Sequence, residues 1–132
     1  MEVSKVCNID YIMDLLDWNN SIVDQTKGKE LAREVKSINV FLQPCDVKHN
    51  KNVWDNCAEI LADRTDEELA PYLIELMEWV QDLNWPGALR ILDRLKKFEK
   101  DKTFDIYFKS CIKRAKALNE DVWLDNLQEI VK

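Results

Sequence analysis

The sequence predicts an all-α fold of about six main helices, stacked as antiparallel hairpins. Only two glycines and three prolines occur among 132 residues, too few for the many tight turns of an all-β protein. Thr65 and Glu68 have the spacing of a capping box, in which a hydroxyl and a carboxylate satisfy the free amides at a helix start. From there, apolar residues recur at the spacing of a helix that buries one face: Leu73, Leu76, Met77, Val80 and Leu83.

Length and composition indicate a single soluble domain. Apolar residues make up 46% of the chain and charged residues 33%, which is typical of a globular protein. There is no run of 18 apolar residues, and the N-terminal residues lack the apolar core of a cleavable signal. We therefore expect a cytoplasmic protein without a membrane partner, whose four cysteines are free thiols.

The first half of the chain is expected to hold three helices. Asn8 can cap a helix that runs to about Trp18, with Ile12, Leu15 and Leu16 turned inward. Residues 19–28 have the composition of a loop, and a second helix is expected over residues 29–42, before Pro44. Asn52 then caps a third helix over residues 53–62.

The second half is expected to hold the remaining helices. The helix beginning near Pro71 is predicted to end at Asn84 in the left-handed conformation, and Pro86 to start the next helix after about two residues. That next helix is expected to bury one face: Leu89, Leu92 and Leu95, flanked by Ile91 and Phe98. Thr103 is predicted to cap a helix to about residue 118, and a last helix covers residues 121–131.

Two pairs of segments are near copies of each other. YIMDLLDW at residues 11–18 matches YLIELMEW at 72–79, and VWDNCAEIL at 53–61 resembles VWLDNLQEI at 122–130. The order is the same in both halves, which favours a repeat over chance similarity of amphipathic helices. Repetition on this scale in a helical chain is typical of an α-solenoid of the HEAT type. We therefore predict one repeat domain over residues 1–132, with halves at about 8–62 and 65–131.

Residues 73–88, LIELMEWVQDLNWPGA, resemble a small uncharacterised bacterial HEAT-like domain family. The matching motif is an acidic amphipathic helix that ends in a D-x-N-W-P corner, here Asp82, Asn84, Trp85 and Pro86. The resemblance extends well over residues 53–98 and more loosely beyond them. Members of such families are proposed to be immunity proteins, so the resemblance implies that this chain binds and blocks a bacterial toxin.

Two rows of carboxylates are the main candidate protein-binding residues. Glu75, Glu78 and Asp82 fall on one side of their helix, opposite the apolar face. The matching helix carries an equivalent row: Asp10, Asp14 and Asp17. If the two helices lie side by side, the rows form one acidic face that attracts a cationic toxin, although rows of charge are also common on plain solvated helix surfaces.

Tryptophans beside these acids are candidate interface anchors. Trp79 ends its helix at the edge of the apolar face, and Trp85 lies in the following corner. Packing between helices is the alternative role for both.

The charge distribution also bears on the partner. The net charge is −6, composed of −9 over residues 1–83, +6 over 84–118 and −3 over 119–132. The acidic bulk favours a basic protein partner and makes nucleic acid an unlikely one. The alternative is a scaffold or nucleic-acid-binding helical repeat that uses a basic strip within residues 90–116: Arg90, Arg94, Lys97, Lys100, Lys113, Arg114 and Lys116.

Signs of catalysis or metal binding are weak. The one histidine, His49, lies near Cys45 and Cys57, but these three do not form the two short ligand pairs of a structural zinc site. Neither a glycine-rich phosphate loop nor a G-x-S-x-G elbow occurs. We therefore expect a non-enzyme without catalytic residues, cofactor or metal, most simply an immunity protein that neutralises a toxin.

Overall fold

The computed structural model describes residues 8–44 and 50–132. Over these ranges the regular structure is entirely helical, which confirms the predicted all-α class. The longer helices are α2 (Ile9–Leu15), α3 (Ile22–Ala32), α4 (Trp54–Ala62), α6 (Leu73–Trp79), α7 (Ala88–Lys96), α8 (Lys102–Ala117) and α9 (Asp121–Glu129). Four short elements connect them: η1 (Ile38–Phe41), η2 (Lys51–Val53), α5 (Asp66–Leu69) and η3 (Ala70–Tyr72).

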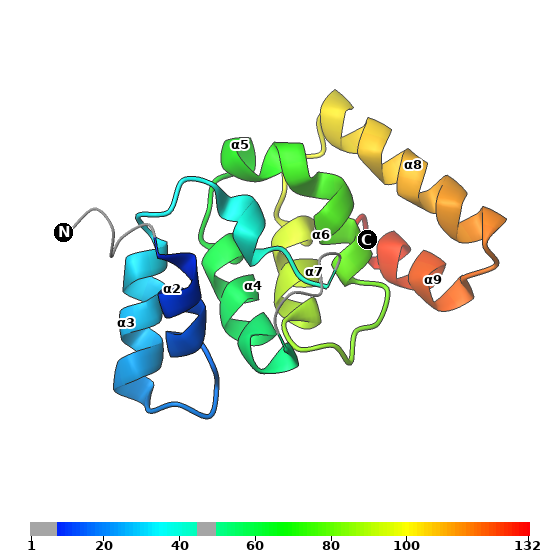
Figure 1. Ribbon diagram of the computed structural model, residues 1–132. Coiled ribbons are helices and arrows are strands. Elements are labelled where there is room, and N and C mark those ends of the chain that lie inside the picture. Colours follow the sequence, from blue (N-terminus) through cyan, green and yellow to red (C-terminus); the bar gives the residue numbers. More distant parts are fainter. Residues whose placement is uncertain (1–7, 45–49) are drawn as a thin grey trace.

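The helices form a stack of packed pairs (Figure 1). α2 packs on α3, η1 on α4, α6 on α7, and α8 on α9. Further contacts join successive pairs: α3 contacts α4, α4 contacts α7, and α6 contacts α8. α3, α4 and α7 thus form one row along the stack. None of the described helices combines the length and the apolar character that crossing a bilayer requires.

The second helix lies earlier in the chain than predicted. Residues 19–28 were expected to be a loop, but α3 begins at Ile22, where the Ser21 hydroxyl accepts a hydrogen bond from the Asp24 amide. It ends at Ala32, so the prediction of a helix over residues 29–42 is wrong except for its first turn. Gly28 explains the close packing of this helix, because a Cβ there would lie 2.9 Å from side-chain atoms of both Leu15 and Leu16.

The predicted caps are correct at two of four positions. Asn8 caps α2 and Thr65 forms the capping box with Glu68, as expected. Asn52 does not cap the third helix, because the Asn50 side chain caps η2 and α4 follows directly. Asp101 rather than Thr103 caps α8, accepting a hydrogen bond of 2.8 Å from the Phe104 amide.

The corner between α6 and α7 is longer than predicted. α6 ends at Trp79, and residues 80–87 form the connection in place of the expected link of about two residues. Asn84 is not left-handed, because its amide is held in a turn by the Asp82 carboxylate at 2.8 Å. Gly87 takes the left-handed conformation instead, with φ 83°, and α7 begins immediately after it.

The core follows the predicted faces of α6 and α7 except at Leu89. Leu73, Leu76, Met77 and Val80 are all buried, as expected. Leu89 was predicted to be buried but is 64% exposed, because α7 buries a face that includes the small residue Ala88: Ala88, Ile91, Leu92 and Leu95.

Matching contacts occur in the two halves of the chain. The carbonyls of Leu16 and Met77, which correspond in the two similar segments, each accept a hydrogen bond from the later helix of their half. The donors are the Asn56 amide on α4, at 2.7 Å, and the Trp123 indole on α9, at 3.0 Å. These contacts favour an internal repeat, and the division into halves at about 8–62 and 65–131 stays a prediction.

Candidate functional site

The predicted carboxylate row on α6 is not an open surface. Glu75, Glu78 and Asp82 are all partly buried. The Glu78 carboxylate accepts a hydrogen bond of 2.9 Å from Arg114 on α8, and burial together with this neighbouring Glu78 raises the pKa of Glu75. The expectation of an outward row is wrong because α8 packs over this side of α6.

The matching row on α2 lies elsewhere. Asp10 and Asp14 are exposed, while the Asp17 carboxylate accepts a hydrogen bond of 2.8 Å from the Asn19 amide. In Figure 1 α4 stands between α2 and α6, so the two rows do not form the single acidic face that was predicted.

The two candidate anchor tryptophans belong to an aromatic cluster in the corner. Trp79 is wholly buried and donates its indole N–H to the Pro86 carbonyl at 3.1 Å. It packs edge-on against Trp54, and Trp85 does the same at a centroid distance of 6.0 Å. Trp79 is therefore no surface anchor, and Trp85 is half-buried in the same cluster.

Most of the basic strip is engaged within the protein. Arg90 bonds to Asp55 at 3.0 Å, and Arg114 bonds to Glu78 at 2.9 Å. Lys97 pairs with Asp93, and the Lys100 ammonium donates to three carbonyls near the end of α7. Lys113 and Lys116 are exposed. Carboxylates of the chain therefore accompany Arg90, Lys97 and Arg114, which reduces the positive charge that the strip offers to a phosphate backbone.

Two of the four cysteines lie within the described residues. Cys57 and Cys111 are free and buried, and burial raises the pKa of their thiols to about 12 and about 11. Cys7, Cys45 and His49 lie outside the described residues. Within the described ranges, no three potential metal ligands come together.

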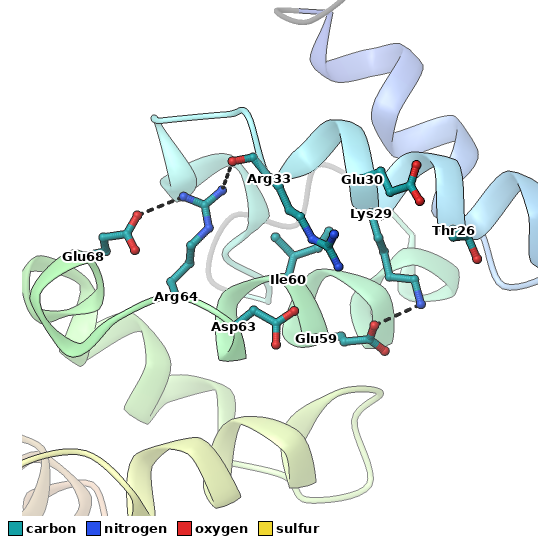
Figure 2. A pocket seen from close by; sticks show the side chains of 9 residues that line it. All are labelled: Thr26, Lys29, Glu30, Arg33, Glu59, Ile60, Asp63, Arg64 and Glu68. Carbon is teal, nitrogen blue, oxygen red and sulfur yellow. Dashed lines mark hydrogen bonds and ion pairs between the residues drawn. The ribbon is translucent and has the colours of Figure 1, made fainter.

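The structure instead assembles a charged groove along α4. Gln25 of α3 bonds to Asn56 near the start of α4, whereas Arg64, just past its end, bonds to the Ala32 carbonyl. The two helices therefore run in the same direction, with a cavity of about 430 Å³ beside them (Figure 2). The lining residues are Thr26, Lys29, Glu30, Arg33, Glu59, Ile60, Asp63, Arg64 and Glu68.

A second hollow extends this surface from α4 to α7. Its lining residues are Glu59, Ala62, Asp63, Arg64, Arg90, Asp93, Arg94 and Lys97. The two hollows share Glu59, Asp63 and Arg64, so together they form one charged groove across α3, α4 and α7. Glu59 and Asp63 are four residues apart and line both hollows. Basic side chains of α3 line the first hollow, and basic side chains of α7 line the second.

Ion pairs tie the three helices together within this groove. Glu59 pairs with Lys29 of α3 at 3.0 Å and lies 3.8 Å from Arg90 of α7. Arg94 of α7 donates to the Asp66 carboxylate at 2.6 Å and to the Arg64 carbonyl at 2.9 Å. Most charges of the groove are thus held in pairs that join the three helices.

Asp66 makes this arrangement sensitive to acid. Burial raises the pKa of its carboxyl, but the Glu99 amide and the Arg94 guanidinium outweigh burial, so the pKa lies below its ordinary value. A lowered folded pKa stabilises the fold above the unfolded pKa of about 3.9, and this contribution is lost as the pH falls through the folded value.

We therefore expect Asp66→Asn to lower the free energy of unfolding by only about 1 kcal/mol at pH 7, since the side chain is 37% exposed. The difference from wild type should shrink toward zero as the pH falls below 4. Urea unfolding at pH 7, 5 and 3 measures it, and a difference as large at pH 3 as at pH 7 would assign the effect to packing instead.

Three charged side chains in the groove have no partner. Within the described residues, the Arg33 guanidinium and the carboxylates of Glu30 and Asp63 make no hydrogen bond or ion pair, and Figure 2 shows all three among the groove residues. All three residues are exposed. They leave one cation and two anions available to a ligand of mixed charge.

Sequence reasoning missed this groove. The regular spacing of Asp55, Glu59 and Asp63 marks one side of α4 as acidic, and this spacing was available from the sequence. The side of the groove that α3 forms could not be predicted, because residues 19–28 were expected to be a loop and the helix was placed too late in the chain.

Comparisons with known proteins bear on the family. No curated protein and no solved structure gives a significant match. The model of one family, described as a domain of unknown function (DUF5071), matches residues 47–131, a range that includes α4 to α9 and leaves out α2 and α3. The prediction of an uncharacterised family is thereby confirmed, while the match carries no information about HEAT-like repeats or toxin immunity. Because the family model matches more than half of the residues of the chain, the chain belongs to the DUF5071 family.

Proposed function

We propose that this chain is a non-catalytic, cytoplasmic protein-binding module, and that its partner is a bacterial protein toxin that it neutralises. The charged groove across α3, α4 and α7 is the proposed contact surface. The observation that carries protein binding is a set of unpartnered charges of both signs, Glu30, Arg33 and Asp63, among side chains whose charges are otherwise paired within the described residues.

Both signs of charge in one groove fit a protein surface better than a nucleic acid. A protein can present a carboxylate to Arg33 and an amine or guanidinium to Asp63, each forming a charge-assisted hydrogen bond. A nucleic acid backbone offers only anions, which Asp63 and the carboxylates of α4 would repel. The net charge of −6 adds attraction at long range to a basic partner, which increases the association rate.

The toxin role rests on the resemblance of residues 73–88 to proposed immunity proteins. This role is tested by measuring the growth of cells that express the products of neighbouring genes, singly and together with this chain. We expect one product to arrest growth alone, to be harmless in the presence of this chain, and to elute with it as one complex. Retention of the chain on DNA or RNA at about 0.15 M salt, with no toxic neighbour, would contradict the proposal.

The groove itself is tested by reversing two of its free charges, one of each sign. Arg33→Glu and Asp63→Lys are each expected to weaken toxin binding about tenfold, the loss of one charged contact across an interface. Lys109→Glu and Asp105→Lys make the same changes in an exposed pair on α8, away from the groove, and should leave the Kd within about twofold. Equal losses in both sets of variants would show that general charge rather than the groove determines affinity. Circular dichroism of each variant checks that it is folded.

A further inference from the structure

An exposed apolar patch lies at the turn between α2 and α3, and we call it the tip. It consists of Trp18, which is 46% exposed, and of Ile22 and Val23, which are each 76% exposed. Large apolar side chains exposed together are uncommon on a monomer and mark surfaces that another molecule covers. Tryptophan in particular is enriched among the residues that dominate binding energy.

Hydrogen bonds hold the backbone of this turn in place. The Trp18 amide donates to the Asn52 carbonyl at 3.1 Å, and the Gln25 side chain donates to the carbonyls of Trp18 and Asn20. The Asn56 side chain in turn donates to the Gln25 side-chain oxygen, which links the turn to α4. The tip is therefore presented in a preformed arrangement, and less conformational entropy is lost when a partner binds.

The charges next to the tip are mainly acidic. Asp14 lies on α2, Asp17 in the connection and Asp24 on α3. The nearest base in sequence, Lys27, lies over the Tyr11 ring at 5.6 Å. A second copy of this chain would bring like charges together around the same apolar contact. Lysines and arginines around an apolar pocket of a different protein would complement them.

The tip also lies in line with the charged groove. Ile22, Thr26, Lys29 and Arg33 are spaced by four, three and four residues, so they lie along one side of α3. Thr26, Lys29 and Arg33 line the groove, and Ile22 continues the same row to the tip. One partner can therefore cover the tip and the groove at once.

We infer that the tip is an apolar anchor that inserts into a pocket rimmed by lysines and arginines on a protein partner. This inference rests on the proposed protein-binding function but not on the partner being a toxin. The turn between α8 and α9 supplies a matched control, because Leu118 and Val122 are exposed to similar extents, 58% and 66%, while the neighbouring Trp123 is buried and offers no exposed anchor.

Photo-cross-linking of the full chain in its native cells tests the inference. p-Benzoylphenylalanine is placed at position 22 or, as the control, at position 118. We expect one protein to be cross-linked from position 22 and not from position 118, through a peptide that lines an apolar pocket with a basic rim. Cross-linking to a second copy of this chain, equal cross-linking from both positions, or none from position 22 would overturn the inference.

Affinity measurements with the purified cross-linked protein complete the test. Trp18→Ala should raise the Kd at least tenfold and Asp24→Lys severalfold, whereas Leu118→Ala should leave it unchanged. If the cross-linked protein is harmless to cells, the anchor stands and the toxin proposal fails. If a toxin is neutralised but Trp18→Ala leaves the Kd unchanged, the anchor fails and the toxin proposal stands.

Discussion

Replacing Arg64 by alanine is expected to lower the free energy of unfolding by about 3 kcal/mol. The Arg64 side chain is only 12% exposed, and its guanidinium donates to the carbonyls of Ala32 and Val35, each at 2.9 Å. The same group pairs with Glu68 at 3.0 Å. It therefore supplies the donor for the Val35 carbonyl, adds a second donor to the Ala32 carbonyl, which also accepts from the Val35 amide, and attaches the end of α3 to the end of α4 and to α5. Alanine would leave the partly buried Val35 carbonyl without this donor.

Urea unfolding followed by circular dichroism measures this loss. Arg64→Lys should recover only part of it, because an ammonium cannot reproduce the planar fork that reaches two carbonyls and a carboxylate. Lys97→Ala is the surface control: its side chain is 71% exposed and pairs with Asp93 one turn away, so no measurable loss is expected. A loss below about 1 kcal/mol for Arg64→Ala would mean that water replaces the guanidinium at the α3 terminus.

The parts of the fold that depend on short stretches of chain could be predicted. The capping box of Thr65 and Glu68 needs only four residues, and the buried face of α6 needs only its own periodicity. The Asn8 cap is equally local. The fold class follows from many such features together, which is why it is correct although several helix boundaries are not.

α3 could not be predicted, because its sequence has no apolar face. Ile22 and Val23 are exposed, and the residues that it buries are the small Gly28 and Ala32. What holds it is tertiary: close packing of Gly28 on α2 and the contact of Arg64 with its last turn. The exposed residues that obscure the helix also form the tip. A segment whose sequence departs in this way from the usual pattern of a helix is where a functional surface is expected.

The candidate site was mispredicted for a related reason. A helical wheel places Glu78 opposite the apolar face of α6, but it contains no information about which helix packs there. The contact between Glu78 and Arg114 joins residues 36 positions apart, and only the packing of α8 on α6 brings them together. The groove likewise needs three helices from separate parts of the chain.

Replacing Gly87 by alanine is expected to lower the free energy of unfolding by about 4 kcal/mol, through two separate effects. First, φ is 83° at this residue, a conformation that costs an alanine about 1–2 kcal/mol. Second, the new Cβ would lie 2.6 Å from the Ala58 Cβ and 2.9 Å from the Trp54 carbonyl oxygen. Neither neighbour is the end of a flexible side chain, so α4 and α7 would have to separate.

Two further variants distinguish these effects in thermal and urea unfolding. Asn119 is left-handed with φ 55° but exposed, so Asn119→Ala should show the conformational effect alone, about 1 kcal/mol. Ala58→Gly in the Gly87→Ala background removes the closest contact and should restore part of the lost stability, although glycine within α4 is itself unfavourable. If Gly87→Ala costs no more than Asn119→Ala, the contact with α4 adds nothing to the backbone requirement. A larger loss that Ala58→Gly relieves shows that Gly87 is needed for the close approach of α4 and α7. These are two of the three helices that form the charged groove.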